Sequence, residues 1–333
     1  QGQENTISGQ LTVSTFGGGT ANTELEFLTG DSMAFLPYNC SAYQVFIKSE
    51  MPNLTSGLDS LGYQTAAIHP YLSTSWNRTN VYRFFGFEAQ YYQDDFAADA
   101  GRVRDYISDS ASYKKIFELS KRENTPLFVF NVTMQNHGGY DWDGDGYFDK
   151  RICLTGEEQD KYPTVDQYLS LVRYSDDAVQ ELISYFSKVD EPTAIVFFGD
   201  HQPNLPEDFY NTLLESQRGN LSDAELRQKK MVTPFFIWAN YDIKEQTNMQ
   251  ISANYLSAYA LNALGCSTSG FDQMRLALQQ QIPVMNVNGY RLPDGSWYPQ
   301  SEQPENDLLN DYHHAEYAQI FDAKNRSDEW YTP

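Results

Sequence analysis

The sequence predicts an α/β fold, in which a mostly parallel central sheet is flanked by helices. Two observations support this prediction. Short runs of β-branched and aromatic residues are bounded by breakers, and these runs alternate with longer segments of helical periodicity. The chain has 333 residues, of which 41% are hydrophobic and 15% aromatic. This composition is enough for one large domain with a small appendage.

Four apolar runs are expected to form the buried strands of this sheet. They span residues 64–70, 126–139, 193–203 and 233–240. Continuous apolar runs of this length are typical of strands that are covered by helices on both faces. In an open α/β sheet, ligands bind outside the carboxyl ends of the strands. The residues at the carboxyl end of each run, and those just after it, are therefore the candidate site residues.

Two helices and a C-terminal region of different composition complete the predicted fold. Residues 165–189 place apolar side chains near a 3.6-residue period, and residues 251–265 form a second helix with Gly265 at the C-cap position. After about residue 270, a hairpin around Leu-Pro-Asp-Gly is expected over residues 285–299, followed by a peripheral helix over 302–325. We therefore expect a main domain over residues 1–270 and a small α+β subdomain over 271–333.

Charge and composition exclude several functions. The formal net charge is −22, whereas binding to nucleic acid requires a basic face, so nucleic acid is excluded as a partner. The three cysteines include no Cys-x-x-Cys pair, which argues against a structural zinc site. No apolar run reaches transmembrane length, and the polar opening segment indicates the interior of a longer protein.

Three of the five histidines follow predicted strands: His69, His137 and His201. Any one of them could be a hydrogen-bonded structural histidine, but the three together indicate a site. Asp200 directly precedes His201, and a carboxylate beside an imidazole is a suitable ligand pair for Zn²⁺ or Mn²⁺. The alternative is that Asp200 caps a turn.

The segment after the first predicted strand offers an imidazole, an indole and a guanidinium within ten residues. These are His69, Trp76 and Arg78. Arginine is the usual partner of phosphate oxygens, so this segment is a candidate phosphate site. The alternative is a surface loop in which Trp76 packs on the domain.

Three consecutive glycines, residues 17–19, lead into a predicted helix that presents Thr20 in its first turn. Free amide groups and the helix dipole stabilise negative charge there, which favours a nucleophilic hydroxyl or a bound phosphate. The stretch matches neither a P-loop nor a dinucleotide-binding loop. The alternative is a plain helix start, in which Thr23 and Glu26 form a capping box.

An acidic loop resembles a calcium-binding loop of the EF-hand type. Asp141, Asp143, Asp145 and Asp149 occupy ligand positions 1, 3, 5 and 9, but position 12 is Ile152 where glutamate is expected. The loop is therefore either a candidate Ca²⁺ site or a solvated acidic surface.

In this order, the motifs resemble the lipoteichoic acid synthase family of phosphoglycerol transferases, within the alkaline phosphatase/sulfatase-like superfamily. The resemblance spans residues 5 to about 270. "GGGTANTE" resembles the family's nucleophile loop, which implies that Thr20 is both nucleophile and metal ligand. "GDH" resembles its metal pair, which implies Asp200 and His201 as ligands of Mn²⁺, or of Zn²⁺ or Mg²⁺. An alkaline phosphatase-like fold is implied as well.

The same resemblance implies a substrate and a reaction. His69, Trp76 and Arg78 would contact a glycerophosphate group, and His137 would bind the phosphate or assist proton transfer. The reaction would move glycerol phosphate from a lipid such as phosphatidylglycerol to a glycerophosphate polymer or glycan, through a phospho-threonine intermediate. It would take place at the outer face of the bacterial cytoplasmic membrane.

The chain departs from the family pattern in two respects. No strand ending in an acidic metal ligand precedes the glycine loop, and the family's N-terminal transmembrane helices are absent. We therefore expect an extracytoplasmic piece of a membrane protein that lacks its first strand, binds metal weakly and is inactive alone.

The sequence also bears on other functions of the same superfamily. A sulfatase nucleophile requires Cys/Ser-x-Pro-x-Arg, which Cys40 does not provide. A metal-dependent phosphodiesterase or phosphatase of the same fold remains an alternative, as does a binding domain without turnover. His313 and His314 lie within the expected peripheral helix and are interpreted as surface residues.

Overall fold

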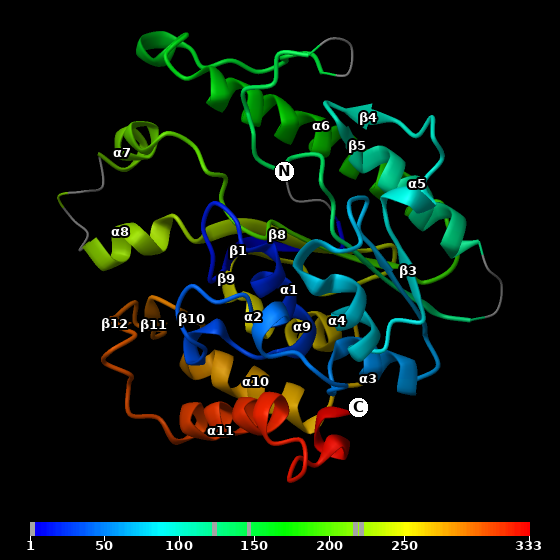
Figure 1. Cartoon of the computed structure of the whole chain (residues 1–333). Helices are drawn as coiled ribbons and strands as arrows, with labels where there is room; N and C mark the ends of the chain where they lie inside the picture. Colours follow the sequence, from blue (N-terminus) through cyan, green and yellow to red (C-terminus); the bar gives the residue numbers. More distant parts are fainter. Residues whose placement is uncertain (1–3, 122–124, 145–147, 216–218, 220–222) are drawn as a thin grey trace.

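Two β-sheets with helices packed against them form the centre of the computed structural model (Figure 1). The structure describes residues 4–121, 125–144, 148–215, 219 and 223–333. Within the described residues, no helix has the length and apolar character needed to cross a membrane.

The larger sheet has four strands, and its order does not follow the chain. In spatial order the strands are β7 (Ala194–Phe198), β8 (Val232–Ala239), β1 (Thr6–Thr12) and β9 (Gln246–Ser252). Strand β8 is antiparallel to both of its neighbours, whereas β1 and β9 are parallel. The predicted strands over 193–203 and 233–240 are confirmed as β7 and β8. Strand β8 runs antiparallel to its neighbours, whereas a mostly parallel sheet was expected.

The second sheet has three strands, which are all parallel. In spatial order they are β3 (Ala89–Tyr91), β2 (Gln64–Ile68) and β6 (Leu127–Asn131). The predicted strands over 64–70 and 126–139 are therefore confirmed, although each strand ends earlier than its apolar run. The shorter strands place the histidines of these runs in the loops beyond the sheet.

Strand β1 was not predicted, because polar residues alternate with apolar ones along it. Ile7 and Leu11 are buried, while its other face carries small and polar side chains. A Cβ atom on Gly9 would lie 2.0 Å from the carbonyl oxygen of Met249, so only glycine allows β9 to approach this closely. The strand ends shortly before the glycine loop and so positions that loop at the carboxyl end of a central strand of the sheet.

The helices cover the sheets on both faces. They are α1 (Thr20–Thr29), α2 (Ala42–Val45), α3 (Leu54–Ser60), α4 (Arg78–Phe84), α5 (Asp109–Ser120), α6 (Pro163–Phe186), α7 (Glu207–Glu215), α8 (Asp223–Lys229), α9 (Ala253–Ala263), α10 (Gly270–Gln281) and α11 (Asp307–Phe321). The predicted helices over 165–189 and 251–265 correspond to α6 and α9. Gly265 follows α9 with a φ of 74°, as expected of a C-terminal glycine. A short hairpin, β4 (Arg102–Val103) and β5 (Tyr106–Ile107), precedes α5.

The C-terminal region adds a small antiparallel sheet and α11. Its strands are β10 (Val284–Asn286), β11 (Gly289–Arg291) and β12 (Trp297–Pro299). The predicted hairpin corresponds to β11 and β12. Leu309 and Tyr312 of α11 are buried in the same hydrophobic core as Leu11 and Leu25. A subdomain boundary at residue 270 therefore stays a prediction.

The two sheets meet around one aromatic side chain of α1. The Phe27 ring lies 5.9 Å from that of Phe130 in β6 and 4.9 Å from that of Phe198 in β7. Each of these strands is the last of its sheet, and no described strand pairs with the outer edge of either one. The sheets therefore lie next to each other with two unpaired strand edges at their junction.

Candidate active site

The glycine loop presents Thr20 at the N-terminus of α1. Gly17, Gly18 and Gly19 all have positive φ values, of 71°, 154° and 89°, which side chains would strain. Gly19 is the N-cap and makes no side-chain cap, so the first turn of α1 is open. Thr20 is half-buried, and no hydrogen bond of its hydroxyl is found among the described residues. The helix end favours negative charge on that oxygen.

The capping-box alternative is wrong, because the N-cap of the helix is Gly19, four residues before Thr23. Thr23 lies within α1 and donates its hydroxyl to the carbonyl oxygen of Asp200 at 2.7 Å. Glu26 turns away from the helix start and accepts hydrogen bonds from the Ser14 hydroxyl and the Met33 amide. Thr23 thus connects the nucleophile helix to the loop that follows β7.

A second contact joins the same two loops. The amide of Gly17 donates to the carbonyl oxygen of Gln202 at 2.9 Å, and Phe16 and Gln202 form a parallel β-bridge. Two regions about 180 residues apart in sequence are therefore held together by backbone hydrogen bonds. The structure in this way brings Thr20 to the region of Asp200 and His201.

Asp200 and His201 form an arrangement that suits a divalent cation. The imidazole Nδ1 lies 2.8 Å from the carbonyl oxygen of Gln202 and donates to it, which leaves Nε2 as an acceptor. That Nε2 atom faces the Asp200 carboxylate at 3.3 Å. Two acceptors directed at each other require a cation or a proton between them. A backbone carbonyl that orients a histidine is also typical of metal ligands.

The ligand set is nevertheless small in the part of the chain that the structure describes. No group of three or more His, Cys, Asp or Glu side chains there is placed to hold a metal ion. The donors at this site are the Thr20 hydroxyl, Asp200 and His201. A tetrahedral metal centre would need a further ligand beside these three, so the predicted metal site stays a prediction.

His69 and Arg78 are in direct contact, and both are buried. His69 is 1% exposed and Arg78 is 2% exposed. The Arg78 Nη1 atom donates to His69 Nε2 at 3.2 Å, and the Glu24 carboxylate holds Nε and Nη2 of the same guanidinium. Burial, and then the Arg78 charge, lower the pKa of His69 to about 4, so the ring is neutral. Their predicted contact with the substrate stays a prediction.

Trp76 lies in a turn at the surface, and its predicted contact with the substrate stays a prediction. Its side chain is 37% exposed, and both Trp76 and Asn77 have a positive φ, of 56° and 61°. Left-handed backbone at two consecutive non-glycine residues is strained, and such strain is often stored at functional sites. This turn starts α4 and directs Arg78 inward.

His137 lies on an exposed loop after β6, near enough to His201 and Asp200 to be influenced by their charges. Partial desolvation lowers the pKa of His137, with a smaller effect of the nearby His201 charge, while a hydrogen bond at Gly138 acts in the opposite direction. Arg104 donates to the carbonyl oxygens of Gln135, His137 and Gly139 and so clamps the loop. A neutral, accessible imidazole can accept a proton at neutral pH.

Sequence reasoning missed two residues at this site, Glu24 and Arg104. Glu24 lies four residues after Thr20, so both occupy the same face of α1, and this spacing was a readable signal. Arg104 lies in a loop without a recognisable motif, and only the tertiary structure brings it to His137.

The acidic loop is only partly described. Asp145 lies outside the described residues, while Asp141, Asp143 and Asp149 are exposed. Gln167 of α6 holds the backbone of Trp142 by two hydrogen bonds, so the described part of the loop lies against α6. The Ca²⁺ site stays a prediction.

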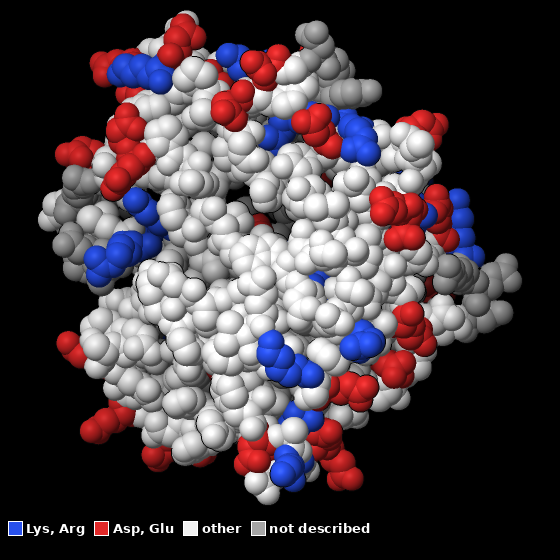
Figure 2. Space-filling model, viewed as in Figure 1, with Lys and Arg blue, Asp and Glu red and all other residues white. Residues whose placement is uncertain are grey.

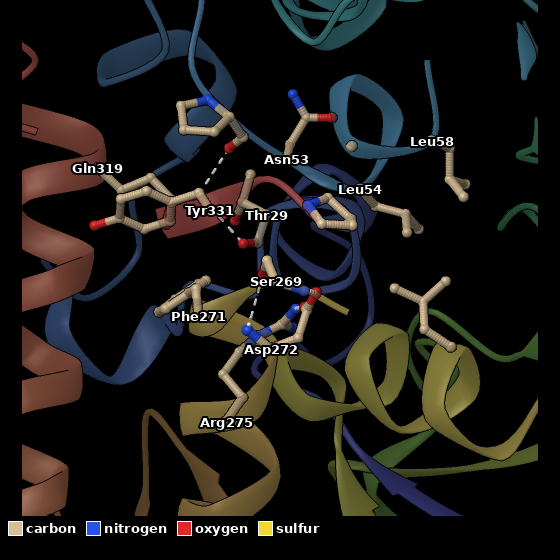
Figure 3. A pocket seen from close by; sticks show the side chains of 14 residues that line it. Thr29, Asn53, Leu54, Leu58, Ser269, Phe271, Asp272, Arg275, Gln319 and Tyr331 are labelled. Carbon is tan, nitrogen blue, oxygen red and sulfur yellow. Dashed lines mark hydrogen bonds and ion pairs between the residues drawn. The ribbon is translucent and has the colours of Figure 1, made fainter. Parts of the chain in front are cut away.

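Two other features lie away from Thr20. His313 and His314 are exposed on α11, where His313 stacks on Phe35. A cavity of about 20 Å³ lies beside Thr29, at the opposite end of α1 from Thr20 (Figure 3). Asp272 and Arg275 line it as an ion pair. Its volume suits one water molecule rather than a substrate.

Charged side chains are unevenly distributed over the face of the molecule that Figure 2 shows. Figure 2 shows a hollow near the middle of this face, surrounded mainly by uncharged side chains, while acidic side chains gather toward the margin. An uncharged rim lowers the repulsion that an anionic substrate would meet on a protein of net charge −22.

Several known proteins are similar to this chain in sequence. The family model named Sulfatase matches residues 4–266. A protein of Rhizobium meliloti, provisionally described as a cyclic beta-1,2-glucan modification protein, is 30% identical over 95% of this chain and 50% of its own length. Lipoteichoic acid synthase of Staphylococcus aureus is 28% identical over 54% of this chain and 27% of its own. The chain thus spans about half the length of its first relatives, or less.

Solved structures share the fold. The phosphoglycerol transferase GacH of Streptococcus pyogenes, in complex with sn-glycerol-1-phosphate, has a TM-score of 0.73 and 21% identity, covering 95% of this chain and 76% of its own. The lipoteichoic acid synthase LtaP of Listeria monocytogenes has a TM-score of 0.66 and 18% identity, covering 96% and 83%. The resemblance to the lipoteichoic acid synthases and the alkaline phosphatase-like fold are both confirmed. The chain belongs to the Sulfatase family.

Proposed function

We propose that the protein is a metal-dependent phosphoglycerol transferase that uses Thr20 as its nucleophile. One observation carries this proposal: the Gly17–Gly19 turn presents the Thr20 hydroxyl, without a hydrogen-bond partner among the described residues, next to the loop that bears Asp200 and His201. A hydroxyl at a helix N-terminus beside two metal-ligand types is suited to attack on phosphorus.

The proposed reaction has two steps. Thr20 Oγ attacks the phosphorus of a phosphodiester such as phosphatidylglycerol, the bond to diacylglycerol breaks, and diacylglycerol leaves with a proton. A hydroxyl of the acceptor then attacks the glycerophospho-threonine, and Thr20 regains its proton. His137 is the group that moves this proton, since the Nε2 atom of His69 already accepts from Arg78.

A divalent cation belongs to this proposal. Thr20, Asp200 and His201 would hold it, and Mn²⁺ is the first choice ahead of Zn²⁺ or Mg²⁺. When bound, it would lower the pKa of a coordinated hydroxyl and balance charge on phosphoryl oxygens.

We also propose that a further acidic ligand comes from a strand outside residues 1–333. Strands β6 and β7 both lie beside Phe27, and each has an edge that pairs with no strand among the described residues, which supports a place for such a strand between the two sheets. A strand there would end near the carboxyl ends of β6 and β7, where the loops with His137 and Asp200 begin.

The comparisons support the substrate class. The GacH structure is a complex with sn-glycerol-1-phosphate, and lipoteichoic acid synthases are among the similar proteins. The acceptor is then a glycerophosphate polymer, or a glycan as the description of the Rhizobium relative suggests. An extracytoplasmic location, with attachment to the membrane through helices outside this chain, is proposed on the same grounds; the C-terminal periplasmic domain of EptC from Escherichia coli shares the fold, with a TM-score of 0.58.

Release of diacylglycerol from phosphatidylglycerol vesicles tests the function. With Mn²⁺ present, the full-length protein is expected to release diacylglycerol, and an acceptor glycan is expected to gain glycerol phosphate. Asp200→Asn should lower the release at least about a hundredfold, because the charge near the nucleophile is lost. Free glycerol phosphate as the only product would instead indicate a phosphodiesterase of the same fold. No release by the full-length protein would contradict the proposal and leave a binding domain.

Metal binding by residues 1–333 is expected to be weak. Three donors leave the coordination incomplete, so calorimetry should give an Mn²⁺ affinity at least about tenfold below that of a chain that includes the preceding segment. His201→Gln should weaken the binding further, whereas the same change at exposed His314 should not. Tight stoichiometric binding by residues 1–333 would contradict the missing-ligand proposal.

A further inference from the structure

Glu24 lies at the centre of a buried charge network one helical turn below Thr20. Its Oε1 and Oε2 atoms accept from Arg78 Nε at 3.0 and 3.3 Å, and Arg78 Nη2 also donates to Oε1. The Tyr82 hydroxyl donates to Oε2 at 2.7 Å. The carboxylate therefore fixes one complete side of the guanidinium in a bidentate arrangement.

The fixed guanidinium determines the state of His69. Because arginine has only donors, Arg78 Nη1 must donate to His69 Nε2, and the ring proton must be on Nδ1. His69 Nδ1 then donates to the carbonyl oxygen of Val132 at 3.0 Å, beyond the end of β6. Glu24 is thereby connected through hydrogen bonds to Arg78 in α4, and through Arg78 and His69 to the loop that follows β6.

In this network, Arg78 and Glu24 each stabilise the charged form of the other. Burial alone would lower the pKa of Arg78, and the Glu24 carboxylate reverses that effect and raises it. Removing one partner of a buried pair leaves an uncompensated charge. Among the described residues, one N–H of Nη1 and one of Nη2 have no hydrogen-bond partner, so two donors remain for phosphate oxygens.

We infer that Glu24 is a positioning residue for phosphoryl transfer: it holds the Arg78 guanidinium so that its two remaining donors meet the phosphoryl group that Thr20 attacks, and it keeps His69 as a neutral acceptor of Arg78. This inference rests on the proposed function. Helix α1 then carries both the nucleophile Thr20 and Glu24, the residue that orients the Arg78 guanidinium. Because both lie on one helix, the distance between Thr20 and Glu24 stays constant.

Kinetics of the full-length protein on phosphatidylglycerol vesicles test the positioning role. Glu24→Gln keeps the shape and removes the charge, and kcat is expected to fall at least about tenfold with a smaller change in KM. Glu24→Asp should recover part of this loss. Tyr82→Phe removes only the other hydrogen bond to Glu24 and should lower kcat less than threefold. Glu26→Gln is the matched control, since it changes a buried carboxyl of the same helix that does not contact Arg78.

A spectroscopic readout that needs no turnover separates this inference from the proposed function. Imidazole ¹⁵N spectra of residues 1–333 should show the Nδ1–H tautomer of His69, and the signals of His69 are assigned by their loss in His69→Gln. In Glu24→Gln, the tautomer of His69 should change. An Nε2–H tautomer in the parent, or equal kcat for Glu24→Gln and Glu26→Gln, would overturn the inference while the function stands. A parent without turnover but with the Nδ1–H tautomer would instead count against the function alone.

Discussion

Replacing Thr20 with alanine is expected to abolish glycerol phosphate transfer in the full-length protein. The loss should be at least about a thousandfold, because no other hydroxyl is presented by the Gly17–Gly19 turn at the start of α1. The measurement is diacylglycerol release from phosphatidylglycerol vesicles. Mass spectrometry of the parent should also find the glycerophosphoryl group on a peptide that contains Thr20.

Two variants control for effects on the fold. Thr20→Ser retains a hydroxyl and should keep a measurable part of the activity. Thr23→Val removes the hydrogen bond to the carbonyl oxygen of Asp200 and leaves the nucleophile in place, so its loss should be much smaller than that of Thr20→Ala. Unchanged diacylglycerol release by Thr20→Ala would remove Thr20 as the nucleophile.

The free energy of unfolding is expected to fall between pH 5 and pH 8 because of three buried carboxyl groups. Glu26, Asp31 and Glu316 are each no more than 1% exposed. One oxygen of Glu26 accepts hydrogen bonds from Ser14 and Met33, and one oxygen of Glu316 accepts a hydrogen bond from Ser32. The other oxygen of each carboxyl group, and both oxygens of Asp31, have no hydrogen-bond partner among the described residues. These groups join α1, the segment that follows it, and α11.

Burial raises the pKa of all three carboxyl groups. That of Glu26 rises from 4.5 to about 7, with the Ser14 hydrogen bond acting against the rise. Burial raises the pKa of Asp31 against the opposing charges of Arg275 and Arg326, and it raises that of Glu316, to which the Asp31 charge adds. The folded protein therefore holds protons that the unfolded chain releases near pH 4 to 4.5.

The sign of the effect follows from this difference. Stability from these groups is fully present below the unfolded pKa and is lost as the pH rises through the folded pKa. For Glu26 alone, a change from 4.5 to 7 corresponds to about 3 kcal/mol at 1.36 kcal/mol per pKa unit.

Urea unfolding at pH 5 and pH 8 measures this effect. Glu26→Gln cannot ionise, so its stability relative to the parent should improve by about 2–3 kcal/mol between pH 5 and pH 8. The same change at exposed Glu302 should leave the pH dependence of the parent intact. Equal pH dependences for the parent and Glu26→Gln would show that Glu26 is already ionised at pH 5.

Much of the fold was predictable because its signals are local. Strands β2, β6, β7 and β8 are continuous apolar runs, and α6 has a clear helical period. Strand β1 was missed because small and polar residues alternate with its apolar ones, and its place between β8 and β9 depends on pairing with segments far away in the sequence. The antiparallel direction of β8 was missed for the same reason, since pairing partners are far apart in sequence.

The sequence by itself determined which chemistry is available. Thr20 after three glycines, the Asp200–His201 pair and the histidines after β2 and β6 were all readable, because strand ends and helix starts are local features. Only the tertiary structure decided how these groups are combined. It joined the glycine loop to Gln202, paired Glu24 with Arg78, neutralised His69, and buried Glu26, Asp31 and Glu316 together. The physical reason is that hydrogen bonds, charge pairing and desolvation depend on distances between segments that are far apart in the chain.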